Sequence, residues 1–248
     1  MMQPARVICR LPSTTVPVRS IFGWGSASAK SDRVFAPAEA KGGLETINPK
    51  KTALVLIEYQ NEFATEGGKM YDAVKGCMEY TGMLDKSAKV VAAAREKGAK
   101  IMFVPISFAA DNSDNPNKGL GILHGCADGG LFTTGTWGAE ICEPMSPVEG
   151  DLIVKNKKGL DAFPGTDLEE LLVSNGIETV VISGFLTNCC VESTMRTAYE
   201  KGFNTITLTD CCATVSNEGH DAAASGTFGM FSTPMTAADF AAKLGAKL

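Results

Sequence analysis

The sequence predicts an α/β fold, a Rossmann-like three-layer sandwich around a six-stranded, mostly parallel sheet. From residue 52 onward, short apolar runs alternate with helical stretches, which is the pattern of successive βαβ units. The crossovers of such units are right-handed and leave neighbouring strands parallel. One segment, residues 107–150, breaks the alternation because it is rich in Gly, Asn and Asp and weakly periodic. An irregular segment of that length is usually functional, so we expect it to form a wall of a pocket.

Three elements are expected before this segment. Residues 52–57 are a short, bounded apolar run, typical of a strand buried on both faces. Residues 83–97 are predicted to form a helix, because apolar residues recur along one side and Gly98 follows them as a stop signal. Residues 100–105 are predicted to form the second strand.

The remaining elements follow the irregular segment. Residues 152–154 are expected to form a short third strand. The residues Thr166-Asp167-Leu168-Glu169 match a capping box, so Thr166 should cap a helix that runs to Val173. The other expected elements are strands at 179–183, 204–209 and 230–232, a helix that follows Cys190 and ends at the stop signal Gly202, and helices at 218–226 and, after Thr236, at 237–244.

Residues 1–43 differ in composition from the expected domain, which spans residues 44–248. Up to Lys30 the chain contains Arg6, Arg10 and Arg19, several serines and no acidic residue. This composition is typical of an organellar transit peptide, and the alternative is a disordered tail. A transit peptide predicts location in a plastid or mitochondrion after its removal, and otherwise the cytoplasm is expected.

Composition excludes several classes of function. The net charge of −5 provides no basic face for nucleic acid. No apolar run approaches the roughly 18 residues that a membrane helix needs. The eight cysteines include no Cys-x-x-Cys motif, and four of them form two pairs of sequence neighbours, Cys189-Cys190 and Cys211-Cys212. We therefore expect reduced thiols in an intracellular compartment rather than a disulfide scaffold.

Three reactive side chains follow three of the predicted strands. Glu58 follows the first strand, Lys157 the third and Cys190 the fourth. Because ligands of open parallel sheets bind at the carboxyl ends of the strands, we expect these groups to converge on one site. Cys190 also precedes a predicted helix, whose first N–H groups should lower the pKa of its thiol. An acid, a cation and a thiol together favour covalent catalysis.

The segments that carry these residues resemble the isochorismatase-like cysteine hydrolases. The first segment, ALVLIEYQNEF, spans residues 53–63; the second, KKGLDAFPGTDL, spans 157–168; and the third, SGFLTNCCVEST, spans 183–194. Each motif is weak alone, but their order along the chain is specific. The resemblance implies a six-stranded parallel sheet and a triad of acid, lysine and cysteine.

Transferred residue by residue, the resemblance assigns Cys190 as the nucleophile, Lys157 as the lysine and Glu58 as the acid. Cys190 is chosen over Cys189 because the family cysteine stands three residues after a threonine and before a valine. Counting back from Gly165-Thr166 selects Lys157, whereas counting forward from Gly150-Asp151 falls between Lys155 and Lys157. The acid is a departure, since the family usually has aspartate. A base displaced by about 1 Å can cost roughly 100-fold in rate unless the site is built around it.

The resemblance also implies a cis peptide and an oxyanion hole. The cis bond would join Phe185 to Leu186, and the N–H groups of Leu186 and Cys190 would stabilise an oxyanion. Three aromatic residues are candidates for the substrate pocket, with core packing as the alternative for each: Phe63, Phe108 and Trp137.

No metal and no cofactor are expected. Metal-dependent relatives, the nicotinamidases, have an aspartate and histidines just after the second strand, where this chain has Val104-Pro105-Ile106-Ser107-Phe108. The two histidines, His124 and His220, have no partner at ligand spacing. Nicotinamide is therefore not the expected substrate.

The function predicted from these residues is a metal-free cysteine hydrolase that cleaves a C–N bond of a small amide or ureide through a thioester. Two alternatives remain: an isochorismatase-type vinyl-ether hydrolase, or an impaired family member that serves as an interaction or structural subunit. The expected partners are a small-molecule amide or isochorismate-like substrate and further copies of the chain in a homo-oligomer, with no nucleic acid and no membrane.

Overall fold

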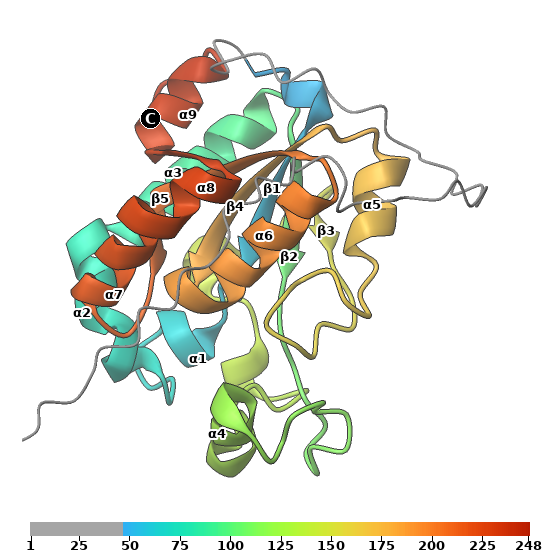
Figure 1. The fold of residues 1–248 in the computed structure, drawn as a ribbon, viewed down its shortest axis with the longest axis vertical. Coiled ribbons are helices and arrows are strands. Elements are labelled where there is room, and N and C mark those ends of the chain that lie inside the picture. The colour runs from blue at the N-terminus through green and yellow to red at the C-terminus, as the bar shows by residue number, and fades with distance from the viewer. Residues whose placement is uncertain (1–46) are drawn as a thin grey trace, which may run out of the picture. The chain divides into compact units, whose positions relative to one another are not determined.

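The computed structural model describes residues 47–248, so the predictions for residues 1–43 lie outside the described residues. Within them a single parallel sheet has the order β3-β2-β1-β4-β5-β6 (Figure 1). Its strands are β1 (Thr52–Ile57), β2 (Lys100–Val104), β3 (Leu152–Ile153), β4 (Thr179–Phe185), β5 (Asn204–Ala213) and β6 (Thr233–Met235). The predicted α/β class and the six parallel strands are confirmed.

Helices cover both faces of the sheet. They are α1 (Asn61–Ala64), α2 (Tyr71–Thr81), α3 (Met83–Glu96), α4 (Gly121–Gly129), α5 (Leu168–Ser174), α6 (Glu192–Glu200), α7 (Asn217–Ala222), α8 (Phe228–Phe231) and α9 (Ala237–Lys243). Side chains of β1 alternate between two cores, as the two-residue period of a strand requires. Leu54 and Leu56 join the core under α2, α3 and α9, whereas Val55 and Ile57 join the core under α5, α6 and α8.

Several predicted boundaries are wrong. The strand expected at 230–232 is helical, because α8 ends only at Phe231 and β6 follows it. The buried Phe228 ring anchors α8 in the core and keeps these residues helical. The N-cap of α5 is Asp167 rather than Thr166, and the Asp167 carboxylate accepts the N–H of Lys155. The Thr166 hydroxyl still accepts the N–H of Leu168, the first residue of the helix. The helices α2 and α4 were not expected.

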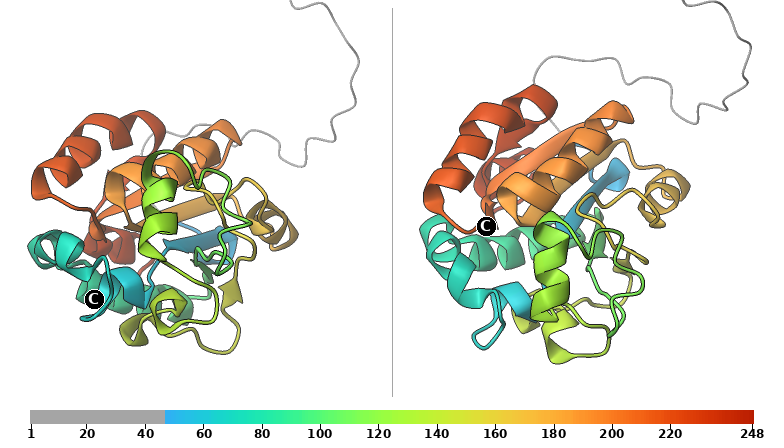
Figure 2. Two further views of the ribbon diagram at one scale, coloured as in Figure 1. Left: turned by 90° about the horizontal axis from the view of Figure 1, so that it is seen from below. Right: turned by 60° about the horizontal axis from the view of Figure 1, so that its bottom comes forward.

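The segment between β2 and β3 carries α4. It lies at the bottom of Figure 1 and comes forward in the right-hand view of Figure 2. Two lysines attach this segment to the rest of the chain. Lys158 bonds to the Ser107 carbonyl and to Asp114, while Lys69 bonds to the carbonyls of Gly129 and Gly130. The segment is therefore held by specific contacts although its sequence shows little periodicity.

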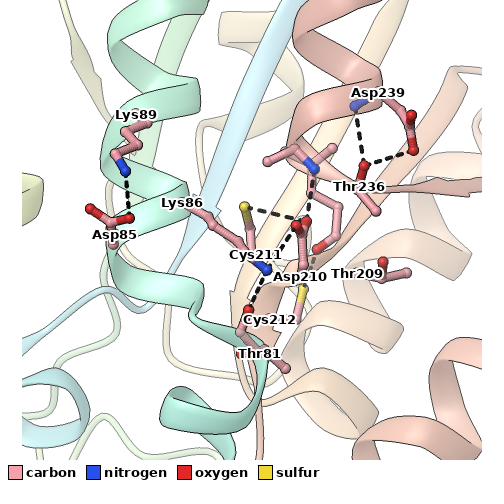
Figure 3. Close-up of polar contacts among 12 residues, drawn as sticks. Thr81, Asp85, Lys86, Lys89, Thr209, Asp210, Cys211, Cys212, Thr236 and Asp239 are labelled. Carbon is pink, nitrogen blue, oxygen red and sulfur yellow. Dashed lines mark hydrogen bonds and ion pairs between the residues drawn. The ribbon is translucent and has the colours of Figure 1, made fainter. Parts of the chain in front are cut away.

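Asp210, in the second half of β5, ties two helices to the sheet (Figure 3). One carboxylate oxygen accepts the N–H of Ala237 at the start of α9, at 2.7 Å. The other lies 3.2 Å from Lys86 of α3, which also donates to the Thr81 carbonyl. Thr236 caps α9 by accepting the N–H of Asp239. No helix among the described residues is long and apolar enough to cross a membrane.

Candidate active site

Glu58 directly follows β1 and has an unusual backbone conformation. Its φ is 56°, a left-handed value that few residues other than glycine adopt. Its N–H bonds to the Val104 carbonyl of β2 at 3.1 Å, so the turn is fixed against the neighbouring strand. On the other side, a Cβ at Gly184 of β4 would lie 2.0 Å from the Ile57 carbonyl oxygen. The approach of β4 to the end of β1 therefore requires glycine.

Lys157 is paired with Glu58 inside the protein. Its Nζ lies 2.5 Å from Glu58 Oε1 and 2.5 Å from the Gly159 carbonyl oxygen. The two side chains are 0% and 3% exposed. Burial lowers the pKa of Lys157, but the Glu58 carboxylate and the Cys190 sulfur raise it by more, so the net shift is upward. Lys155, the alternative in the sequence, is exposed.

Cys190 lies in the π-helical turn Thr187–Val191, between β4 and α6. It is 3% exposed, and the Phe185–Leu186 bond that precedes the turn is cis. The expectation of a lowered thiol pKa is wrong. A hydrogen bond with Cys189, burial and the Glu58 carboxylate together raise the pKa of Cys190 well above its usual value, although Lys157 opposes them. At rest, the thiol therefore keeps its proton and needs a base.

The thiol of Cys189 is the hydrogen-bond partner of Cys190, and its pKa shifts in the opposite direction. The pKa of Cys189 is lowered overall, chiefly by the hydrogen bond from the Cys190 thiol. Burial and the Glu58 carboxylate raise it, whereas Lys157 and the Cys190 N–H lower it further. The Leu186 carbonyl accepts the N–H groups of Cys189 and Val191 and so closes the turn.

The three residues after Glu58 fix the first motif. Tyr59 is buried, and its hydroxyl contacts Ser87, Ser183 and the Cys211 carbonyl at 2.7, 3.0 and 2.9 Å. Gln60 donates to the carbonyls of Ile106 and Ala139 and accepts the Ile106 N–H. Asn61 donates to the Trp137 carbonyl. These contacts bind the motif to α3, β4 and β5 and to the segment that follows β2, and nothing in the sequence pattern predicts the role of Tyr59.

The predicted pocket aromatics lie in different places. Phe63 is buried and stacks on Phe185, with 5.0 Å between the ring centroids. Phe108 is 1% exposed and belongs to the same core. Trp137 is 47% exposed, so it is not a core residue. It lines an open depression of about 510 Å³ whose walls include none of Glu58, Lys157 and Cys190.

His220 supports the turn that contains Cys190. Its Nδ1 lies 3.0 Å from the hydroxyl of buried Thr187. Burial lowers the pKa of His220 from 6.5, and Asp221 opposes that shift. No group of three or more His, Cys, Asp or Glu residues within 47–248 could hold a metal ion.

We expect His220 to make stability depend on pH. Because its pKa is lower in the folded state, the folded protein binds fewer protons than the unfolded chain as the pH falls below 6.5. The free energy of unfolding should therefore decrease from pH 7 to pH 5, and His220→Gln should reduce that decrease. Urea unfolding at pH 7, 6 and 5 measures it, with the exposed His124 changed to Gln as control. Identical pH dependence in wild type and His220→Gln would contradict this role.

Comparison with known proteins identifies relatives. A sequence model of the isochorismatase domain matches residues 52–239, a range that includes Glu58, Lys157 and Cys190. The chain is 28% identical over 200 residues to the ureidoacrylate amidohydrolase RutB of Methylorubrum extorquens, which covers 76% of this chain and 79% of that protein.

Solved structures are similar as well. An isochorismatase family protein from Desulfovibrio vulgaris matches with a TM-score of 0.69 and 27% identity, over 79% of this chain and 98% of its own. N-carbamoylsarcosine amidase from Thermoplasma acidophilum matches with a TM-score of 0.61 and 25% identity, over 75% of this chain and 96% of its own.

Proposed function

This chain belongs to the isochorismatase family of hydrolases, and from that premise we propose that it cleaves a C–N bond of a small amide or ureide through a thioester on Cys190. One observation carries the proposal: the buried ion pair of Lys157 and Glu58 acts electrostatically on the Cys190 thiol. Burying two charges costs free energy because both lose their hydration, and pairing them does not always offset that cost. Ion pairs of this kind beside a buried nucleophile are typical of catalytic sites.

In the first half of the proposed reaction, Glu58 takes the proton of the Cys190 thiol. The thiolate attacks the carbonyl carbon, and the N–H groups of Leu186 and Cys190 stabilise the oxyanion. Glu58 then returns the proton to the nitrogen, the C–N bond breaks, and ammonia or an amine leaves. Lys157 holds the carboxylate in place through its contact with Glu58 and balances the charge.

In the second half, water hydrolyses the thioester. Glu58 accepts a proton from the water while the water oxygen attacks the acyl carbon, and the C–S bond breaks. The proton passes to the sulfur, which restores the thiol and releases the acid. For a ureide, the acyl group is a carbamoyl group, so the released acid is a carbamic acid.

Glutamate in place of the usual aspartate is compatible with this scheme. The added methylene would displace the carboxylate, but the left-handed backbone of Glu58 and its contact with Lys157 still hold it beside the site. This geometry favours an active enzyme over an impaired one.

The relatives support the substrate class. One is named for ureidoacrylate and the other for N-carbamoylsarcosine, and both names denote ureides. We propose that this chain acts on a small amide or ureide of the same reactive chemistry.

Ammonia release from a panel of small primary amides and ureides tests the proposal. We expect ammonia release from at least one of them. Isochorismate has no C–N bond, so its cleavage is followed separately by the loss of its vinyl ether, and we expect none. Turnover of isochorismate alone would support the vinyl-ether reaction instead. No turnover of any compound, with no labelling of Cys190 by iodoacetamide, would support the impaired alternative.

A further inference from the structure

Glu62 is a second buried carboxylate near the catalytic residues, and the proposed mechanism gives it no role. It lies on α1, and 4% of its surface is exposed. Its backbone carbonyl accepts the Met70 N–H. Its carboxylate has no hydrogen bond or ion pair with any residue of the described range 47–248.

The Glu62 carboxylate nevertheless reaches space that solvent can enter. In the described part of the chain, every side-chain nitrogen or oxygen that is sealed from solvent has a hydrogen-bond partner. Because the Glu62 carboxylate has none, its oxygens must retain some contact with accessible space. A buried acid in that position can accept hydrogen bonds from a ligand.

Gly138 leaves room for this carboxylate. A Cβ at Gly138 would lie 2.1 Å from Glu62 Oε2 and 2.9 Å from its carboxyl carbon. Real Cβ atoms do not come this close, so any other residue at this position would displace the carboxylate. The Glu62 carboxylate therefore lies directly against the Gly138 backbone, with which it makes no hydrogen bond.

Glu62 is close to Glu58 because α1, which carries it, begins three residues after Glu58. Cys126 of α4 has a pKa raised to about 11, first by burial, then by Glu58 and Cys189, and also by Glu62, while Lys157 lowers it. One thiol therefore lies within electrostatic range of both carboxylates and of the lysine. The segment that carries α4 is the long insert, which we expected to form a pocket wall.

The charges around the site do not balance. Lys157 neutralises Glu58, and the nearby Lys158 and Lys69 are bound to Asp114 and to backbone carbonyls. Glu62 has no such partner among the described residues. A buried carboxylate without a partner is unfavourable, and a cation that donates N–H groups would relieve this most effectively.

We propose that Glu62 determines specificity by binding a cationic N–H group of the substrate, an ammonium or a guanidinium, at the end remote from the scissile carbonyl. This rests on the proposed amidase function. Substrates with a carboxylate at that end would be repelled by Glu62. The preferred substrates would then differ from the ureides named for the relatives, because acrylate and sarcosine are both carboxylic acids.

Three amides of similar length test this: 4-aminobutanamide, 4-hydroxybutanamide and succinamate. Wild type should prefer the ammonium compound over the carboxylate compound in kcat/KM. Glu62→Gln should reduce that preference by about 10- to 100-fold, the size expected for a charge-assisted hydrogen bond. Glu66→Gln, which changes an exposed acid four residues further on, should leave the ratio within about twofold. An unchanged ratio in Glu62→Gln would overturn the proposal.

A second measurement does not depend on turnover. Iodoacetamide and iodoacetate have similar size, but only iodoacetate is anionic, and their rates of Cys190 alkylation can be followed by mass spectrometry. Glu62→Gln should speed iodoacetate relative to iodoacetamide by about tenfold, whereas Glu66→Gln should not. A shift in this ratio without amide turnover would refute the proposed function and keep the Glu62 site. An equal ratio in wild type and Glu62→Gln would refute the Glu62 site, whether or not amides are turned over.

Discussion

A Cys190→Ala variant is expected to lose amide turnover by at least about 1000-fold, because the thiol that forms the thioester in the proposed reaction is removed. Cys190 is buried in the turn after β4, and because its pKa is raised, the proposed reaction needs Glu58 to take its proton. The change removes one sulfur from a packed site and should leave the fold intact. Steady-state ammonia release measures the loss, and circular dichroism checks the fold.

The neighbouring thiol provides the matched control. Cys189→Ala removes the hydrogen bond that contributes most to the raised pKa of Cys190. We expect Cys189→Ala to keep turnover within about tenfold of wild type and to react with iodoacetamide at lower pH. Turnover at the wild-type rate in Cys190→Ala would refute the thioester. If such a variant cleaved isochorismate, the vinyl-ether reaction would be the better account.

A Lys157→Met variant is expected to have the largest effect on stability. Methionine has nearly the shape of lysine, so the change mainly leaves the Glu58 carboxylate buried without its partner. Breaking a buried ion pair on one side costs about 3–5 kcal/mol of unfolding free energy. With the carboxylate no longer held as a base, kcat should also fall by about 100-fold or more.

Lys158→Met is the matched control for this prediction. Lys158 is the next residue, and its side chain is 29% exposed in its ion pair with Asp114. A partly exposed pair of this kind contributes about 0–1 kcal/mol. Urea unfolding measures the stability of both variants and of the double variant Lys157→Met, Glu58→Gln. The double variant shows how much of the loss comes from the unpaired charge of Glu58. If Lys157→Met were no less stable than Lys158→Met, the buried pair would not have the importance we assign to it.

Much of the fold was predictable because burial leaves a periodic record in the sequence. The five residues that follow Thr52 in β1 are all apolar, and the strand is buried on both faces, as a central parallel strand requires. The short β6 left no such record. It has only three residues, two of them exposed, and it follows the apolar residues of α8. The helix α4 lies in a segment of glycines and polar residues that gives little signal.

The proposed catalytic residues are brought together by topology, which the sequence reveals through the order of strands and helices. Glu58, Lys157 and Cys190 each follow a parallel strand, so their meeting depends on the sheet and not on local detail. The pKa of Cys190 depends instead on neighbours within a few ångströms. Position near a helix start suggested a lowered value, but Cys189, burial and Glu58 outweigh it.

Glu62 was missed for a similar reason. It stands in the first motif next to Phe63, but an acid in a motif does not reveal whether it has a partner. Only the three-dimensional arrangement shows that the neighbouring Gly138 makes room for its carboxylate and that no described residue neutralises it.

The central claim is that Cys190 carries the acyl group during catalysis, with Lys157 and Glu58 beside it. Intact-protein mass spectrometry after acid quench of the protein during turnover of a small amide tests this most directly. We predict one added acyl group per chain, mapped to the peptide that contains Cys190 and absent from Cys190→Ala. Rapid amide turnover with no adduct, or with an adduct on another residue, would contradict the account.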